Sequence, residues 1–352
     1  MITFNVIPLL KKSTRTAFLL TGIFIVLFYG HEALAEAREQ YLIKLATLAP
    51  EGSLWMETFH KINEEITRKT DGRVRLKAYP GGVLGEDRDM LRKIRIGQIH
   101  AGGFSGMGLG SINRDIFTME IPFLFEDYGE VDYVMAKMDE YLRKGFEEKG
   151  YVILGWSEIG FVYLLSNMPV TSLKDLKGAK VWLLEGDDLS STVFSKAGIT
   201  PIPLGIPDIL MALQTNLIDV VYASPLAAIA LQWFTKVKYM TDQPLIYSLG
   251  GVLVTKRIFA KIPSNLQEIV KEVFQYHTSL LNVRMRRDNE EAKKVMAKQG
   301  IEIVTPTDEE IDAFKQMSRK AIDELGSKAF SEDVLAEVRS HINQYRKAQE
   351  GK

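Results

Sequence analysis

The sequence has no cysteine among its 352 residues. This absence excludes disulfide bonds, thiolate metal sites, a cysteine nucleophile and a lipid anchored through cysteine, and it is compatible with an oxidising compartment. The chain also lacks an excess of charge, because its formal net charge is −1. Proteins that bind nucleic acid or anionic membranes usually present a basic surface, so we expect no nucleic-acid partner.

Long hydrophobic runs are also absent, with one exception near the N-terminus. Lys11, Lys12 and Arg15 precede the run "AFLLTGIFIVLFYG", and "HEALAEAREQ" follows it. A basic region, an apolar region of about 13 residues and then Ala-Leu-Ala form the layout of a secretory signal, with cleavage after Ala35. A membrane-spanning helix needs about 20 residues, which makes an uncleaved anchor the weaker alternative. We predict a signal peptide over residues 1–35 and an exported chain.

Catalytic and metal-binding motifs are incomplete. "GGFSGMG" has Met107 where a nucleophile elbow needs glycine, and "GMGLGS" has Ser111 where a dinucleotide fingerprint needs its third glycine. The five histidines form no pair four residues apart, which gives a zinc site no support. Glu185, Asp187 and Asp188 could bind a cation, but an N-cap role for Asp187 or Asp188 is favoured. We predict no catalytic residue, no metal, no cofactor and no enzyme.

The chain after the signal alternates between strand and helix patterns. A strand in "QYLIKLATLAPEGS" leads to a helix that starts at Ser53, its expected N-cap, and ends at Asp71-Gly72. "RVRLKAYP" alternates like a strand, "GGVLGEDRDMLRKIRIGQIH" is a loop and a helix, and "AGGFSGMGLG" is a short glycine-rich strand or loop. This order argues for a parallel sheet covered on both faces.

Two later segments are long enough to run from one lobe to another. They are "YVILGWSEIGFVYLLSN" and "PLIYSLGGVLVTKRIF", and from Pro263 onward the chain is mostly amphipathic helix. We predict an α/β fold of two lobes with hinge strands and a long C-terminal helical region. Lobe 1 comprises residues 36–159 and 248–287, lobe 2 comprises 160–247 and 288–315, and 316–352 form a C-terminal helical segment. Small ligands bind in the cleft between such lobes.

Several ordered motifs carry a family resemblance that covers about residues 40–345. They are "YPGGVLGEDRDMLRKIRIGQIHAGG", "IPFLF", "SLKDLKGAKV", "GITPIPLGIPDILMALQTNLID" and the proline of "YASP". Together they resemble the solute-binding proteins, the DctP family, of tripartite ATP-independent periplasmic (TRAP) transporters. The resemblance implies the two-lobed periplasmic-binding-protein fold. It also implies a periplasmic receptor that closes on a small molecule and delivers it to membrane permease subunits driven by an ion gradient.

The chain departs from this family where the ligand is usually held. Family members have an arginine two residues after the lysine of the "DLKG-x-K" motif, and it forms a bidentate salt bridge with the ligand carboxylate. Here that position is Trp182. A second family arginine is missing from "GFVYLLSN", and no arginine occurs between Arg143 and Arg257. Enclosing a carboxylate without a paired cation costs several kcal/mol.

The predicted ligand-binding residues are therefore aromatic or weakly polar for the most part. Ser224 stands where the family's "ENP" motif has asparagine, and Ile206 stands where an aromatic residue is common. The full predicted set is Trp182, Glu185, Ser224, Tyr222, Phe104, Ser105, Phe161, Tyr163, Glu86 and Ile206.

This lining favours a ligand other than the usual small organic acid. A neutral, amphipathic or hydrophobic molecule fits best, and an organic cation held by aromatic faces and Glu185 is an alternative. The opposing hypothesis is that Trp182 only packs between the lobes while another anchor holds a C4-dicarboxylate or related acid. Two further alternatives stay open: a ligand-sensing module for a membrane signalling partner, and an additional periplasmic subunit that shares the ligand.

Overall fold

The computed structural model describes residues 39–351, and Leu42–Lys352 form one compact unit. The signal peptide predicted over residues 1–35 lies outside the described residues. Within residues 39–351 the helices are too short or too polar to cross a membrane.

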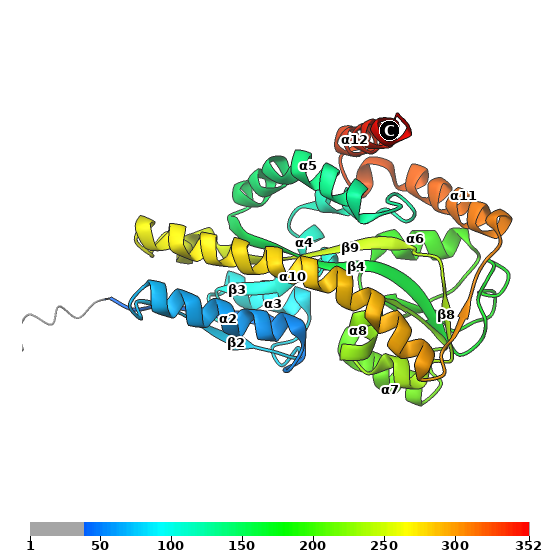
Figure 1. Ribbon diagram of the computed structural model, residues 1–352, viewed down its shortest axis with the longest axis horizontal. Helices are drawn as coiled ribbons and strands as arrows, with labels where there is room; N and C mark the ends of the chain where they lie inside the picture. Colours follow the sequence, from blue (N-terminus) through cyan, green and yellow to red (C-terminus); the bar gives the residue numbers. More distant parts are fainter. Residues whose placement is uncertain (1–38, 352) are drawn as a thin grey trace, which may run out of the picture. The chain divides into compact units, whose positions relative to one another are not determined.

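The first elements follow the predicted alternation of strand and helix (Figure 1). They are β1 (Tyr41–Thr47), α2 (Leu54–Lys69), β2 (Val74–Tyr79), α3 (Asp87–Arg95) and β3 (Ala101–Phe104). β1 lies between β2 and β3 in the sheet and pairs with β3 in parallel, with Leu45 opposite Ala101. Ser53 caps α2 as predicted, because its side chain accepts a hydrogen bond from the Met56 amide at 3.4 Å.

Two long antiparallel strands form the middle of the sheet. β4 (Tyr151–Ser166) pairs with β9 (Ile246–Thr255) from Tyr151 opposite Thr255 to Val162 opposite Ile246. β3 joins β9 at one end of this pair, and β7 (Val220–Ala223) and β8 (Tyr239–Thr241) join β4 at the other end. All these strands belong to one eight-stranded sheet. The expected long strands are confirmed. A first set of elements, which includes β1 to β3, packs at one end of the strand pair, and a second set, which includes β7 and β8, packs at the other end. These two sets are the basis of the two-lobed α/β fold.

The segment between the long strands builds the second set of elements. In order they are β5 (Trp182–Leu184), α6 (Asp188–Lys196), β6 (Ile202–Leu204), η2 (Ile206–Asp208), α7 (Ile209–Gln214), β7 (Val220–Ala223), α8 (Pro225–Ala230), η3 (Trp233–Lys236) and β8 (Tyr239–Thr241). β5 and β6 pair in parallel as a separate two-stranded sheet. Asp187 is the N-cap of α6, accepting from the Ser190 amide at 2.9 Å, so the favoured capping role is confirmed.

The glycine-rich segment after β3 turns into a short helix. Ser105 caps α4 (Gly106–Gly110), which is followed by η1 (Arg114–Met119) and α5 (Tyr128–Glu148). A Cβ at Gly106 would collide with the carboxyl group of Glu120. The glycine therefore lets the first turn of α4 approach a buried acid, which bears on the site described below.

The C-terminal part is helical, as expected. It contains α9 (Lys256–Phe259), α10 (Ser264–Lys298), β10 (Glu302–Val304), α11 (Asp308–Leu325), η4 (Gly326–Lys328) and α12 (Glu332–Glu350). α10 is one continuous helix of 35 residues. It contacts α2, β4 and α8, while α11 packs on α6 and α12 on α5. The C-terminal helices thus cover both ends of the long strand pair (Figure 1).

Candidate functional site

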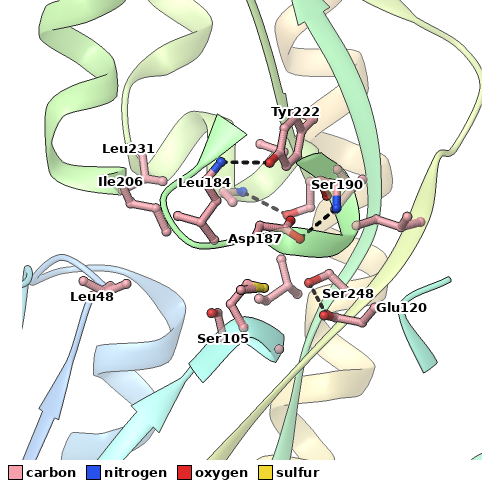
Figure 2. A pocket seen from close by; sticks show the side chains of 18 of the residues that line it. Leu48, Ser105, Glu120, Leu184, Asp187, Ser190, Ile206, Tyr222, Leu231 and Ser248 are labelled. Atoms are coloured by element: carbon pink, nitrogen blue, oxygen red, sulfur yellow. Dashed lines mark hydrogen bonds between the residues drawn. The ribbon is translucent and has the colours of Figure 1, made fainter. Parts of the chain in front are cut away.

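A cavity of about 230 Å³ opens between the two ends of the long strands. Its walls come from the loop after β1, from β3 and α4, from β5 and α6, from β7 to η3, and from β4 and β9. Figure 2 shows Leu48 and Ser105 from the first set of elements facing Leu184, Ile206 and Leu231 from the second. Segments far apart in the sequence meet here, as expected of an interlobe cleft.

Trp182 lines this cavity and is also tightly packed. It is 3% exposed, and its indole Nε1 donates to the Leu204 carbonyl at 2.9 Å. Its ring stacks on Tyr222 with the centroids 4.5 Å apart and meets Trp233 edge-on at 5.4 Å. Trp182 therefore belongs to an aromatic wall, and its indole N–H is already occupied.

Four more of the predicted residues line the same cavity: Tyr222, Ser224, Ser105 and Ile206. The Tyr222 hydroxyl accepts from the Leu184 amide at 3.1 Å, and burial raises the pKa of this phenol. Ser224 caps α8 through the Ala227 amide at 3.3 Å. Ser105 donates from Oγ to Asp87 Oδ2 at 2.5 Å. Most polar atoms of this group are thus engaged within the protein.

Glu86 and Glu185 line a second, adjoining cavity of about 210 Å³. The two cavities share Leu48, Ser105, Met107, Leu184 and Ile206. Burial raises the pKa of Glu86, and Glu185 is exposed. The second cavity also contains Arg88, whose guanidinium donates to the Gly186 carbonyl at 3.4 Å.

The predicted residues Phe104, Phe161 and Tyr163 line neither of these two cavities. Side chains alternate between the two faces of a strand, and the neighbours Gly103 and Val162 are the ones that line the cavity. Phe104 is 4% exposed and lies in the hydrophobic core.

The other two aromatic residues of β4 have partners outside the cavity. Phe161 packs on Tyr128 with the ring centroids 4.8 Å apart, and the Tyr163 hydroxyl accepts from Lys293 Nζ at 2.6 Å. β4 has a register irregularity between Glu158 and Gly160, where Gly160 has φ +92°. Ile159 and Val162, three residues apart, consequently both line the cavity, because a bulge resets the alternation of faces.

Sequence reasoning missed Glu120 as a lining residue. It is 8% exposed, and its Oε1 accepts from Ser248 Oγ at 2.8 Å and from the Leu249 amide at 2.9 Å. Burial raises the pKa of Glu120 to about 7, and the nearby carboxylates of Asp187 and Asp87 contribute to that rise. The available signal was a single acid in the apolar segment "IFTMEIPFLF".

Asp187, for which capping was favoured over cation binding, also lines the cavity. It is 9% exposed, and burial raises its pKa despite the hydrogen bonds from Ser190. Figure 2 shows Asp187 and the Glu120–Ser248 pair on neighbouring sides of the cavity. None of the described residues that line this cavity is lysine, arginine or histidine. Trp55, Phe117 and Trp233 are further aromatic lining residues that the sequence did not reveal.

The described residues contain no group of three or more His, Cys, Asp or Glu side chains arranged to hold a metal ion. The site is instead an aromatic and aliphatic cavity with two buried carboxyl groups. Such an arrangement can enclose a small molecule through apolar contact and offer hydrogen-bond acceptors or negative charge.

Known proteins of similar sequence bind small molecules in the periplasm. The C4-dicarboxylate-binding periplasmic protein DctP of Rhodobacter capsulatus is 24% identical over 277 residues, covering 78% of this chain and 83% of the relative. The 2,3-diketo-L-gulonate-binding periplasmic protein YiaO of Escherichia coli is 24% identical over 251 residues, covering 70% of this chain and 76% of the relative.

Solved structures share the fold. The sugar acid binding protein DctPAm from Advenella mimigardefordensis, in complex with galactonate, superposes with a TM-score of 0.82 at 17% identity, covering 87% of this chain and 99% of that one. A TRAP periplasmic solute binding protein from Ralstonia eutropha, with bound acetolactate, superposes with a TM-score of 0.81 at 22% identity. The match covers 86% of this chain and 99% of that one. The sequence model of the DctP family, described as bacterial extracellular solute-binding protein, family 7, matches residues 45–329. The chain belongs to this family of TRAP transporter solute receptors.

Proposed function

We propose that this protein captures a small molecule in the cavity beside Trp182 and delivers it to the membrane subunits of a TRAP transporter. Members of the family are substrate-binding receptors, not enzymes, and they work with membrane permease subunits. The cavity supports the proposal because it lies where the two sets of elements face each other across the long strands β4 and β9. Ligand contacts to both sides would favour a closed state.

We further propose that the ligand is not held by the usual arginine–carboxylate salt bridge. The observation that carries this proposal is the lining itself, in which the described residues include Glu120 and Asp187 but no cationic side chain. An anion placed there would face two acids in a desolvated site, which is electrostatically unfavourable. Several relatives and structural neighbours bind organic acids, according to their names, so this chain would differ from them in ligand class.

The cellular setting follows from the same comparison. The relatives DctP and YiaO are periplasmic proteins, and we propose a periplasmic location here, reached through the signal over residues 1–35. The lobe boundaries predicted from the sequence, and their closure about β4 and β9, belong to this proposal. An additional periplasmic subunit would shield an amphipathic ligand during its transfer.

Native mass spectrometry of the gently purified full chain tests the receptor proposal. We expect a small molecule to be retained and to be lost on unfolding. Ala227→Leu narrows the cavity and should remove the bound molecule, since Ala227 lines it. Ala297→Leu is the matched control, because it makes the same change on an exposed position of α10.

Two results would contradict these proposals. A molecule retained equally by the Ala227→Leu variant would show that binding occurs elsewhere. A retained carboxylate that disappears in the Ala227→Leu variant would keep the receptor and overturn the arginine-free ligand class.

A further inference from the structure

We propose that the ligand of this cavity is an organic cation, a protonated amine or quaternary ammonium on an apolar body, with its charge held between Glu120 and Asp187. This inference rests on the proposed receptor function and adds the charge of the ligand. It follows from three features of the described structure: two buried acids without a counterion, aromatic walls, and an acidic neighbouring cavity.

The groups that face Glu120 leave its charge uncompensated. β9 supplies the Ser248 hydroxyl and the Leu249 amide, both as neutral donors to Oε1. α4 supplies Gly106, which has no side chain and lies against the Glu120 carboxyl group. The charged groups that act on Glu120 most strongly are Asp187 and Asp87, which are acidic as well. Buried charges in proteins are normally paired, so a cation is the missing component.

Asp187 presents a second acid to the same space. Its Oδ1 accepts from the Ser190 amide as the cap of α6, and Asp188 next to it is a further acid. Glu120 and Asp187 line the same cavity from neighbouring sides (Figure 2), so a ligand that occupies it is exposed to both carboxyl groups. A protonated primary or secondary amine has three or two N–H donors for this pair, whereas a quaternary ammonium would interact with it through charge alone.

The aromatic walls suit a cation with an apolar body. Trp55, Phe117, Trp182, Tyr222 and Trp233 line the cavity. Ring faces attract ammonium groups, tryptophan most strongly, and the attraction increases when the cation is desolvated. The indole N–H of Trp182 is already bonded to Leu204, so this ring offers its surface and not a donor.

The adjoining cavity strengthens the negative potential. It is lined by the acids Glu86, Asp87, Asp89 and Glu185 against one arginine, Arg88. Asp87 is 8% exposed, and its Oδ1 is buried without a hydrogen-bond partner in the described structure. A ligand that enters past these acids is favoured if it is positive and disfavoured if it is negative.

The affinities of a neutral ligand and of a cation should depend on pH in opposite directions, so the pH dependence distinguishes the two ligand classes. A protonated Glu120 could donate to a ligand oxygen, and binding would then weaken as pH rises. A cation needs ionised Glu120, so its affinity should increase between about pH 5.5 and about pH 8. Asp87, whose pKa burial raises to about 6, titrates in the same range, and burial also raises the pKa of Asp187. Ionisation of both groups acts on the cation in the same direction as ionisation of Glu120.

Three test compounds of equal size isolate the charge: phenylpropylamine, phenylpropanol and phenylpropanoate. Isothermal titration of the full chain, after bound molecules are removed, measures their affinities. We expect the amine to bind at least about tenfold tighter than the alcohol, and the carboxylate to bind most weakly. Amine affinity should increase with pH.

Isosteric variants assign the charge to its partners. Glu120→Gln keeps the acceptor for Ser248 and Leu249, and Asp187→Asn keeps a good helix cap. Each should weaken amine binding by about tenfold to a hundredfold and leave alcohol binding nearly unchanged. Asp188→Asn removes the same charge from an exposed neighbour that lines neither cavity, so it should change amine affinity by less than about twofold.

The binding experiments distinguish a wrong ligand charge from a wrong receptor function. Tightest binding of the alcohol or carboxylate, or amine binding that is equal in wild type and Glu120→Gln, would overturn the cation and keep the receptor. Amine binding that weakens as pH rises would also overturn the cation. If no compound binds and the Ala227→Leu variant retains the copurified molecule, both proposals are wrong.

Discussion

Two buried glutamates of this protein, Glu158 and Glu120, differ in whether an arginine pairs with them. Glu158 on β4 is 5% exposed, and Arg286 of α10 binds both of its oxygens, at 2.8 and 2.5 Å. The same arginine binds Asp132 of α5, and its guanidinium lies 4.5 Å from the Tyr128 ring centroid. Glu120 is 8% exposed and has only neutral donors. Glu158 is thus paired with a cation, whereas the donors to Glu120 in the described structure are neutral.

The difference separates structural charge from charge kept for a ligand. Glu130, 2% exposed, is also paired, with Arg346. Helices α10 and α12 therefore supply arginines to the buried acids Glu158 and Glu130, whereas the described lining of the cavity contains no arginine. Leaving an acid buried and unpaired costs stability, and a site that persists at such a cost is a candidate for function.

Removing the arginine that pairs with Glu158 should have the largest effect on stability. Arg286→Ala leaves Glu158 and Asp132 without their cation, and we expect the free energy of unfolding to fall by about 3 kcal/mol or more. Urea denaturation measures this loss. Arg287→Ala is the control, because Arg287 is exposed and forms an ion pair with its neighbour Asp288, so it should cost less than about 1 kcal/mol. Equal losses in both variants would contradict the contrast.

Neutralising Glu120, the glutamate without a paired cation in the described structure, should stabilise the ligand-free protein. The pKa of Glu120 is raised from 4.5 to about 7, so its contribution to stability is complete below about pH 4.5 and is lost as pH rises through about 7. Glu120→Gln removes this loss, and the variant should be more stable than wild type by about 3 kcal/mol near pH 8. Denaturation across pH should show the advantage disappearing near about pH 5. A destabilised variant at pH 8 would mean that Glu120 has a cation partner.

The aromatic wall should be less sensitive than either acid. Trp182→Phe keeps an aromatic ring against Tyr222 but removes the donor to the Leu204 carbonyl. The unpaired carbonyl should cost about 1 to 2 kcal/mol, measured by thermal denaturation. Trp182→Arg should cost far more, because it places an unpaired guanidinium at a position that is 3% exposed. Similar stability of the two variants would show that this wall relaxes freely.

The smallest effect separates the two roles of Asp187. Asp187→Ala should be less stable than Asp187→Asn by about 1 kcal/mol, because only asparagine keeps the N-cap bond to Ser190. Asp188→Ala should change little, since Asp188 is exposed. Chemical denaturation of the three variants checks this order. If alanine and asparagine are equal, capping by Asp187 contributes nothing.

Most of the fold could be predicted from the sequence, because its elements follow local patterns. The alternation from Tyr41 to Phe104, the length of β4 and the cap at Asp187 depend on neighbouring residues. The expectation that Trp182 belongs to the ligand site came from the family resemblance, and Trp182 lines the cavity.

The rest of the site depends on contacts that no local pattern encodes. Glu120 meets Ser248 across 128 residues of chain. The faces of Phe161 and Tyr163 depend on the bulge at Gly160, which an alternating strand pattern does not reveal. A one-residue change of phase moves every later side chain to the other face, and that is why two predicted residues lie away from the cavity.

The distribution of tryptophan gives the molecule a built-in optical reporter. Of its four tryptophans, Trp55, Trp182 and Trp233 line the cavity. The fourth, Trp156, lies outside it on β4, with its indole donating to Asp139 at 2.5 Å. Occupation of the cavity would change the surroundings of three indoles and leave one as an internal reference, so emission colour and quenching can follow binding in the unlabelled protein.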